Sequence, residues 1–331
     1  MQTRPLGRTG LLVSTLGFGC GAVGGLMVRA APAERARAVA MAIDAGVTYF
    51  DTAPQYGNGL SETHLGEILK QLKAAVSLGT KVRIADADKA DLAGAILRSM
   101  DASLGRLGRE HVDLIQLHNP ITEADAPGTI SATRVLEEVV PAFQRLVAAG
   151  KTRFFGVTAI GETAAVLRVV DSGAMFTGQV SYNLLNPSAG RAMPAGLPGQ
   201  DYQRLLARMA QAGMGAIGIR ALAGGALAGE AVRHAVASPP PPPIGSAATY
   251  EADLANAEVM RTLVTEGFAA SMAEAALRFV ITGDGISTAL IGIASVEQLA
   301  AALDAVAKGP LPAAALERLE GLWRDLAGRA R

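Results

Sequence analysis

Residues 112–118 read Val-Asp-Leu-Ile-Gln-Leu-His, a short run that is apolar at most positions. A strand with one face in water alternates apolar and polar residues, whereas a strand of a parallel sheet, buried on both faces, is apolar nearly throughout. Further short apolar runs, most of this kind, occupy residues 16–18, 48–51, 76–82, 152–158, 178–182, 215–220 and 288–293. The sequence therefore predicts eight buried parallel strands.

Amphipathic stretches separate these runs. Leu92, Ile96, Met100, Leu104 and Leu107 are spaced three or four apart, as on one face of a helix, and residues 135–146 and 296–306 repeat the pattern. Eight strand–helix units are the number that closes a parallel barrel, and 331 residues suit that fold. The prediction is an α/β fold, a (β/α)8 TIM barrel formed as a single domain over residues 1–331. A doubly wound open sheet is the alternative.

The two ends of the chain add to the repeating units. Residues 2–6 and 11–15 flank 7–10 and predict a β-hairpin that caps the bottom of the barrel. Residues 313–330 predict an extra C-terminal helix that carries the only tryptophan. Between the last two strands, residues 239–243 are five prolines, which lack backbone donors and cannot form barrel wall. We interpret them as a surface spacer or as a stiff flap beside the mouth.

Composition limits the partners. The chain has 30 Lys and Arg against 30 Asp and Glu, so it offers no basic surface for nucleic acid or membrane. The single cysteine, Cys20, excludes an intramolecular disulfide and fits a reducing compartment, so we expect a cytoplasmic protein. The uncharged residues 11–28 contain five glycines, which favour a strand and loop over a membrane helix. We therefore expect a small-molecule partner.

Residues 19–24 spell the glycine pattern of a dinucleotide-binding Rossmann fold. The apolar run before it is short, and no acidic residue ends a strand about 20 residues later. No helical pattern opens at the glycines either. The pattern is therefore not interpreted as a Rossmann fingerprint.

Four polar side chains fall at the ends of neighbouring predicted strands. Asp51 ends the second strand and Tyr56 follows it, Lys81 lies at the end of the third, and His118 ends the fourth. Each alone has an ordinary structural explanation, such as a helix cap or a core histidine. Because the carboxyl ends of barrel strands open at one mouth, the four together predict an active site.

The segments around these residues resemble the aldo-keto reductase superfamily. The resemblance is carried by FDTAPQYGNGLSETHLGEIL (residues 50–69), LGTKV (78–82) and VDLIQLHNP (112–120), and extends from RPLGRTG (4–10) to LIGIASVEQL (290–299). It implies an eightfold barrel without a Rossmann domain, and a catalytic tetrad of Asp51, Tyr56, Lys81 and His118.

The chemistry of carbonyl reduction requires these residue types. Hydride addition to a carbonyl leaves an alkoxide, and Tyr56 can supply its proton, although a free phenol titrates near ~10. A buried ammonium at Lys81 favours the phenolate, and Asp51 keeps that ammonium charged. A neutral His118 can orient the carbonyl oxygen. No pair among the four histidines has the spacing of metal ligands, so no metal is expected.

The resemblance also implies a nicotinamide dinucleotide, NADP(H) with NAD(H) possible, stretched across the barrel mouth. Barrels commonly bind phosphate with the loops after strands seven and eight, where glycines let backbone amides approach. The candidate cofactor residues are Gly19, Cys20, Asp51, Thr158, Gln179, Arg220, Leu222, Gly224, Gly225, Gly292, Ser295 and Gln298.

Three positions depart from the family pattern. Thr158 and Ala159 stand where the family usually has Ser-Asn, and Ile219 or Arg220 stands where it often stacks a tyrosine on the nicotinamide. Residues 292–298 contain no Lys or Arg, although NADPH-preferring members carry one there to clamp the 2′-phosphate. We therefore expect a weak NADP preference at most. The alternative to an enzyme is a catalytically silent dinucleotide-binding barrel that acts as a redox sensor or accessory subunit.

Overall fold

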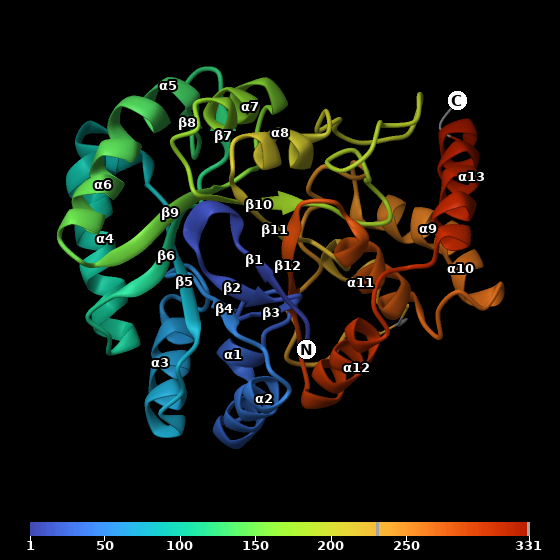
Figure 1. Cartoon of the computed structure of the whole chain (residues 1–331), viewed down its shortest axis with the longest axis horizontal. Coiled ribbons are helices and arrows are strands. Elements are labelled where there is room, and N and C mark those ends of the chain that lie inside the picture. Colours follow the sequence, from blue (N-terminus) through green and yellow to red (C-terminus); the bar gives the residue numbers. More distant parts are fainter. Residues whose placement is uncertain (230–231, 330–331) are drawn as a thin grey trace.

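Eight parallel strands close into a barrel in the computed structural model of the chain, which describes residues 1–229 and 232–329. The barrel order is β10-β11-β12-β3-β4-β5-β6-β9, and every neighbouring pair is parallel (Figure 1). The predicted (β/α)8 barrel is confirmed, and the open-sheet alternative is wrong because β9 pairs with β10 and leaves no edge.

The barrel strands lie within two residues of their predicted bounds. They are β3 Leu16–Gly19, β4 Tyr49–Asp51, β5 Ser77–Val82, β6 Val112–Leu117, β9 Thr152–Thr158, β10 Thr177–Ser181, β11 Gly215–Ile219 and β12 Ile286–Gly292. Two short strands outside the barrel, β7 Ile121–Thr122 and β8 Ile130–Ser131, pair with each other after β6. His118 and Arg220 therefore lie just beyond their strands, in the loops of the mouth.

Helices surround the barrel (Figure 1). They are α1 Leu26–Arg29, α2 Pro32–Asp44, α3 Leu60–Leu72, α4 Leu92–Leu107, α5 Ala132–Arg134, α6 Val140–Ala148, α7 Thr163–Asp171, α8 Leu205–Gln211, α9 Tyr250–Met260, α10 Thr262–Thr265, α11 Met272–Thr282, α12 Val296–Ala307 and α13 Ala313–Arg329. In α4, Asp91 accepts a bond from the backbone of Gly94 at the start, and Gly108 ends the helix with a φ of 60°. Its predicted apolar face is buried against the barrel.

The bottom of the barrel is closed by the N-terminal hairpin. Strands β1 Thr3–Pro5 and β2 Leu12–Ser14 pair antiparallel, as predicted. Leu6 and Val13 from this hairpin are fully buried in a cluster with Tyr49, Leu114 and Ile217 of the barrel strands. The hairpin thus fills the end of the barrel opposite the mouth.

The C-terminal helix α13 follows the last barrel unit and lies beside α9 (Figure 1). Its Trp323 is 1% exposed and donates a hydrogen bond of 2.8 Å from Nε1 to the carbonyl of Leu184. The predicted extra helix is confirmed over 313–329, while residue 330, its predicted end, lies outside the described residues. Among the described helices, none combines the length and the apolar character needed to cross a membrane.

Candidate active site

The carboxyl ends of β4, β5 and β6 bring the four predicted catalytic residues together. Asp51 is the last residue of β4, Lys81 is the fifth residue of β5, and His118 follows β6 directly. Tyr56 lies in the turn between β4 and α3. These three strands are adjacent and parallel in the barrel, so their pairing brings the side chains at their carboxyl ends together.

A buried ion pair forms the base of the site. Lys81 Nζ pairs with Asp51 Oδ1 and donates a hydrogen bond of 2.9 Å to the carbonyl of Thr52. The Lys81 side chain is 1% exposed and that of Asp51 4%. Burial alone would lower the pKa of Lys81, but Asp51 and Tyr56 outweigh burial and raise it above its ordinary value. Lys81 is therefore an ammonium at neutral pH.

Tyr56 lies over this ammonium. Lys81 Nζ is 5.0 Å from the centroid of the Tyr56 ring. Burial raises the pKa of the Tyr56 phenol, and the charge of Lys81 opposes that rise. Tyr56 is consequently protonated at neutral pH and available as a proton donor.

His118 lies at the edge of Tyr56. The two rings are nearly perpendicular, with centroids 6.0 Å apart, and His118 Nδ1 lies 3.3 Å from Gln55 Oε1. Burial and the nearby charges of Lys81 and Arg83 lower the pKa of His118 to about 3. The imidazole is therefore neutral at physiological pH, as its expected role requires.

Gly19, the last residue of β3, and Cys20, which follows it, support the base of the site. The Cys20 amide donates to the carbonyl of Asp51 at 2.9 Å, and the Cys20 carbonyl accepts from Ser61 Oγ at 2.9 Å. Burial raises the pKa of the Cys20 thiol, which keeps it protonated. At Gly19 a Cβ atom would lie 2.7 Å from the carbonyl oxygen of Ile291, so only glycine fits there. Gly19 and Cys20 thus shape the mouth without contributing a side-chain group.

A cavity of about 650 Å³ opens among the loops that follow β3, β11 and β12, within the usual size range of small-molecule sites, about 300–1,000 Å³. None of the four tetrad residues lines it. Predicted cofactor residues line it, namely Arg220, Leu222, Gly224, Gly225, Gly292 and Gln298. Part of the wall is bare backbone: Gly292 is exposed, and a Cβ on Gly24 would lie 2.4 Å from the carbonyl oxygen of Ile293. This glycine-lined cavity fits a dinucleotide whose phosphates need close backbone approach.

The same cavity is lined by residues that are not among the predicted cofactor residues, namely Arg233, His234, Tyr250 and Arg261. Arg233 donates from Nη1 to the carbonyl of Gly224 at 2.7 Å and from Nε to that of Ser238 at 3.0 Å. These cations belong to the long segment after β11, where they form no recognisable motif. Of these residues, Arg233 and Arg261 place positive charge on the wall of the cavity, whereas residues 292–298 contain no Lys or Arg.

Arg220 joins the cavity to the tetrad. It has a φ of 59°, unusual for a residue other than glycine, and its charge interacts with Tyr56. Arg220 Nη2 donates to the carbonyl of Pro242 at 3.1 Å. The proline run therefore lies against the mouth, which favours the flap interpretation over a remote spacer.

Three further predicted cofactor residues lie outside the lining of this cavity, and their cofactor roles stay predictions. The Ser295 hydroxyl caps α12 by accepting from the amide of Gln298 at 3.3 Å. Gln179 is the middle residue of β10, and its Nε2 donates to Asp51 Oδ2 at 2.8 Å. The buried Thr158 hydroxyl has no hydrogen-bond partner within the part of the chain that the structure describes.

Sequence comparison matches the profile of the Aldo/keto reductase family to residues 15–324. The chain belongs to this family. An aldo-keto reductase from Bacillus halodurans, solved in its holo form, superimposes with a TM-score of 0.72 over 97% of this chain and 96% of its own, at 22% identity. That likeness shows the shared barrel fold.

Curated aldo-keto reductase relatives align over shorter regions. L-galactose dehydrogenase of Arabidopsis thaliana is 35% identical over 163 residues, which cover 48% of this chain and 49% of that protein. Pyridoxal 4-dehydrogenase of Microbacterium luteolum is 33% identical over 158 residues, 38% of this chain and 45% of that protein. The chain thus spans about half the length of the curated relatives it matches. Both names are those of oxidoreductases.

Proposed function

We propose that the protein is an NAD(P)(H)-dependent oxidoreductase that interconverts an aldehyde or ketone and the corresponding alcohol. The observation that carries the proposal is the buried Lys81 ammonium, paired with Asp51 and 5.0 Å from the Tyr56 ring centroid. Isolated buried charges are costly, so a charged lysine placed under a phenol implies that the phenol loses its proton during the reaction.

Each member of the tetrad has one task in this proposal. A bound nicotinamide dinucleotide would supply or accept the hydride at the carbonyl carbon. Tyr56 donates a proton to the alkoxide oxygen in reduction and takes it back in oxidation. Lys81 stabilises the phenolate while the proton is absent, and Asp51 holds Lys81 charged. His118, whose pKa is lowered to about 3, orients the carbonyl oxygen and stays neutral.

The cavity residues would hold the dinucleotide. The exposed backbone of Gly292 and the loop of Leu222, Gly224 and Gly225 can present amides to the diphosphate. Arg220 and Arg233 line the same space and place positive charge beside it. We propose NADP(H) as cofactor with NAD(H) also usable, and a small carbonyl or alcohol as substrate. The buried, unpaired Cys20 is in keeping with a cytoplasmic setting.

The test is turnover with both dinucleotides and a panel of aldehydes, ketones and alcohols, followed by nicotinamide absorbance. Tyr56→Phe removes only the hydroxyl, so it should preserve cofactor binding and lower kcat by about 10²–10⁴-fold. Near-wild-type kcat in Tyr56→Phe would refute the assignment of Tyr56. Cofactor binding without turnover on any substrate would favour the silent sensor or accessory barrel instead.

A further inference from the structure

The position of the His118 ring depends on its neighbours in the chain. Its polar side-chain contact is the 3.3 Å approach to Gln55, an exposed residue of the β4–α3 turn. The backbone is held more firmly, because the His118 amide donates to the carbonyl of Val82 at 2.8 Å and so continues the β5–β6 pairing. Contacts that hold the backbone of the next residue therefore also hold the backbone of His118, from which the imidazole extends.

That next residue, Asn119, is fully buried. Its side-chain amide makes the pair of hydrogen bonds that a peptide group of a neighbouring strand would make. Asn119 Oδ1 accepts from the amide of Ile84 at 2.8 Å, and Nδ2 donates to the carbonyl of Ile84 at 2.9 Å. The pair extends the sheet beyond its last register, Val82 with Leu117. The backbone at His118 is thereby held by one bond to Val82, the last residue of β5, and through Asn119 by two bonds to Ile84, which follows β5.

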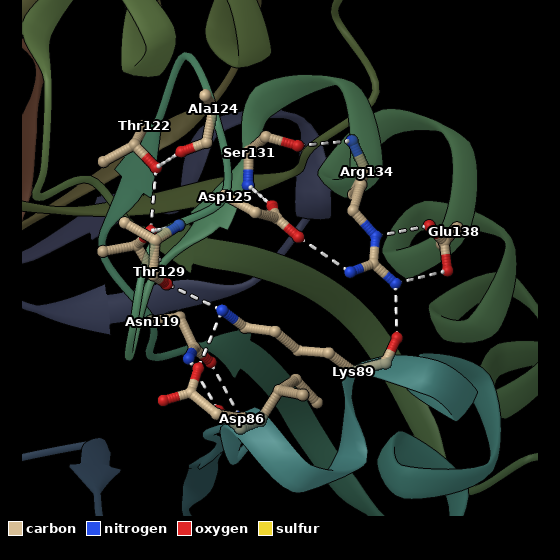
Figure 2. Close-up of polar contacts among 12 residues, drawn as sticks. Asp86, Lys89, Asn119, Thr122, Ala124, Asp125, Thr129, Ser131, Arg134 and Glu138 are labelled. Carbon is tan, nitrogen blue, oxygen red and sulfur yellow. Dashed lines mark hydrogen bonds and ion pairs between the residues drawn. The ribbon is translucent and has the colours of Figure 1, made fainter.

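A third bond ties Asn119 to the loop that follows it. Nδ2 also donates to the carbonyl of Gly128 at 3.1 Å. The amide of Gly128 is held separately by both carboxylate oxygens of Asp86, at 2.9 and 3.1 Å. Lys89 pairs with Asp86 at 2.8 Å (Figure 2). The loop thus has an anchor of its own, which does not pass through Asn119.

We propose that Asn119 is a positioning residue for the carbonyl chemistry, which fixes His118 at the edge of Tyr56 by extending the β5–β6 pairing. The proposal rests on the proposed function, in which His118 orients the carbonyl oxygen. Only a side chain with both a donor and an acceptor can satisfy both polar groups of Ile84. Loss of the amide frees the backbone on the C-terminal side of His118 and leaves the loop anchored through Asp86.

Kinetics of matched variants test the positioning role. Asn119→Ala should lower kcat by about 10²-fold, since small misplacement of a catalytic group costs that much. The dissociation constant of the dinucleotide should not change. Asp86→Asn, which loosens the loop anchor and leaves the bonds to Ile84 intact, should keep kcat within about twofold, as surface substitutions do. In a His118→Gln background the added cost of Asn119→Ala should vanish, whereas a purely structural role would leave that cost in full.

A second readout needs no turnover. Lys81 and Arg83 on the β5 side and Tyr56 and Gln55 on the turn face the His118 ring, and burial with the two cations keeps its pKa low. NMR titration of histidine C2 protons should show no His118 transition between pH 5 and 8 in the wild type. In Asn119→Ala the ring should move towards water and titrate near ~6.5, with His118→Gln identifying the resonance.

The outcomes separate the two proposals. Wild-type kcat together with an unchanged His118 titration in Asn119→Ala would overturn the positioning role. If Asn119→Ala does not fold, Asn119→Ser, which replaces the amide by one short hydroxyl and adds no charge, is judged by the same two readouts. Absence of turnover with every carbonyl would instead refute the reductase, and the titration would still decide how His118 is held.

Discussion

Gln179 of β10 donates a 2.8 Å hydrogen bond across the barrel interior to the Asp51 carboxylate of β4. The same carboxylate oxygen accepts from the Tyr49 hydroxyl at 3.0 Å, while its other oxygen pairs with Lys81. Gln179 is therefore part of the ionic base of the site, in addition to any contact it makes with a dinucleotide. Three strands of the barrel, β4, β5 and β10, are therefore tied together through this one carboxylate.

Gln179→Met keeps the volume and removes this donor. Hydrogen bonds to charged groups contribute about 1.5–3 kcal/mol, so the free energy of unfolding in urea should fall by that amount. Gln144→Met, on the exposed face of α6, should change it by no more than about 0.5 kcal/mol. Equal stability of Gln179→Met and wild type would show that the bond to Asp51 contributes nothing.

Lys81→Met removes the ammonium and keeps most of the stem. Burial then acts on Tyr56 unopposed, so the pKa of the phenol rises further and the alkaline limb of the pH–rate profile should move to higher pH. Asp51 is left buried without its cation, which should cost about 3–5 kcal/mol of stability. Lys151→Met breaks an exposed pair with Asp101 and should cost at most about 1 kcal/mol. Superimposable pH–rate profiles would show that Lys81 does not tune Tyr56.

Stability should depend on pH through His118. Its pKa is about 3 when folded and near ~6.5 when unfolded, so below pH 6.5 the unfolded chain binds a proton that the folded chain does not. The free energy of unfolding should therefore fall as pH drops from 7 to 5, by about 2 kcal/mol from this group.

His118→Gln should remove this contribution to the pH dependence of the free energy of unfolding. His111→Gln, at an exposed position before β6, should retain it. Urea unfolding at pH 5, 6 and 7 measures the difference. If His118→Gln and wild type show the same slope, the imidazole is not held in its neutral form by the fold.

Cofactor choice should be only weakly biased towards NADP(H). Residues 292–298 offer no cation, and the Gln298 side chain is occupied in accepting from the amide of Ala294 at 2.9 Å. We expect kcat/KM with NADPH to exceed that with NADH by less than about a hundredfold, or about 2.7 kcal/mol. Gln298→Arg should then shift the ratio towards NADPH by adding a charge-assisted bond.

Arg233 is the control for this expectation, because it lines the same cavity from the segment after β11. If the wild type already prefers NADPH more than a hundredfold and Arg233→Ala abolishes that preference, the clamp comes from this segment. In that case Gln298→Arg should add little.

The barrel and the tetrad were predictable because short-range patterns encode them. Apolar runs such as 112–117 identify strands buried on both faces, and parallel pairing then places Asp51, Lys81 and His118 at one mouth. The extent of the domain over residues 1–331 stays a prediction. The NAD(P)(H) chemistry and the individual roles of the site residues stay proposals.

The remaining cavity residues could not be predicted, because long-range contacts place them. Arg233 and Tyr250 reach the cavity only because the segment after β11 folds back onto the loop after β3, where the Ser238 amide donates to the carbonyl of Val23 at 3.0 Å. For Ser295, whose position suggested a ligand contact, the structure shows a helix-capping hydroxyl, and the cofactor role stays a prediction. Local sequence does not distinguish these two uses of a serine.

The packing of Trp323 gives the chain an internal optical probe. It is the only tryptophan, it is 1% exposed, and it lies on α13 outside the residues that line the cavity. Its emission therefore reports how α13 sits against α11 and the loop after β10, where Phe279 and Leu184 contact the indole. Substitutions at the mouth that leave this fluorescence unchanged have left the packing of α13 intact, so a loss of turnover in them belongs to the chemistry.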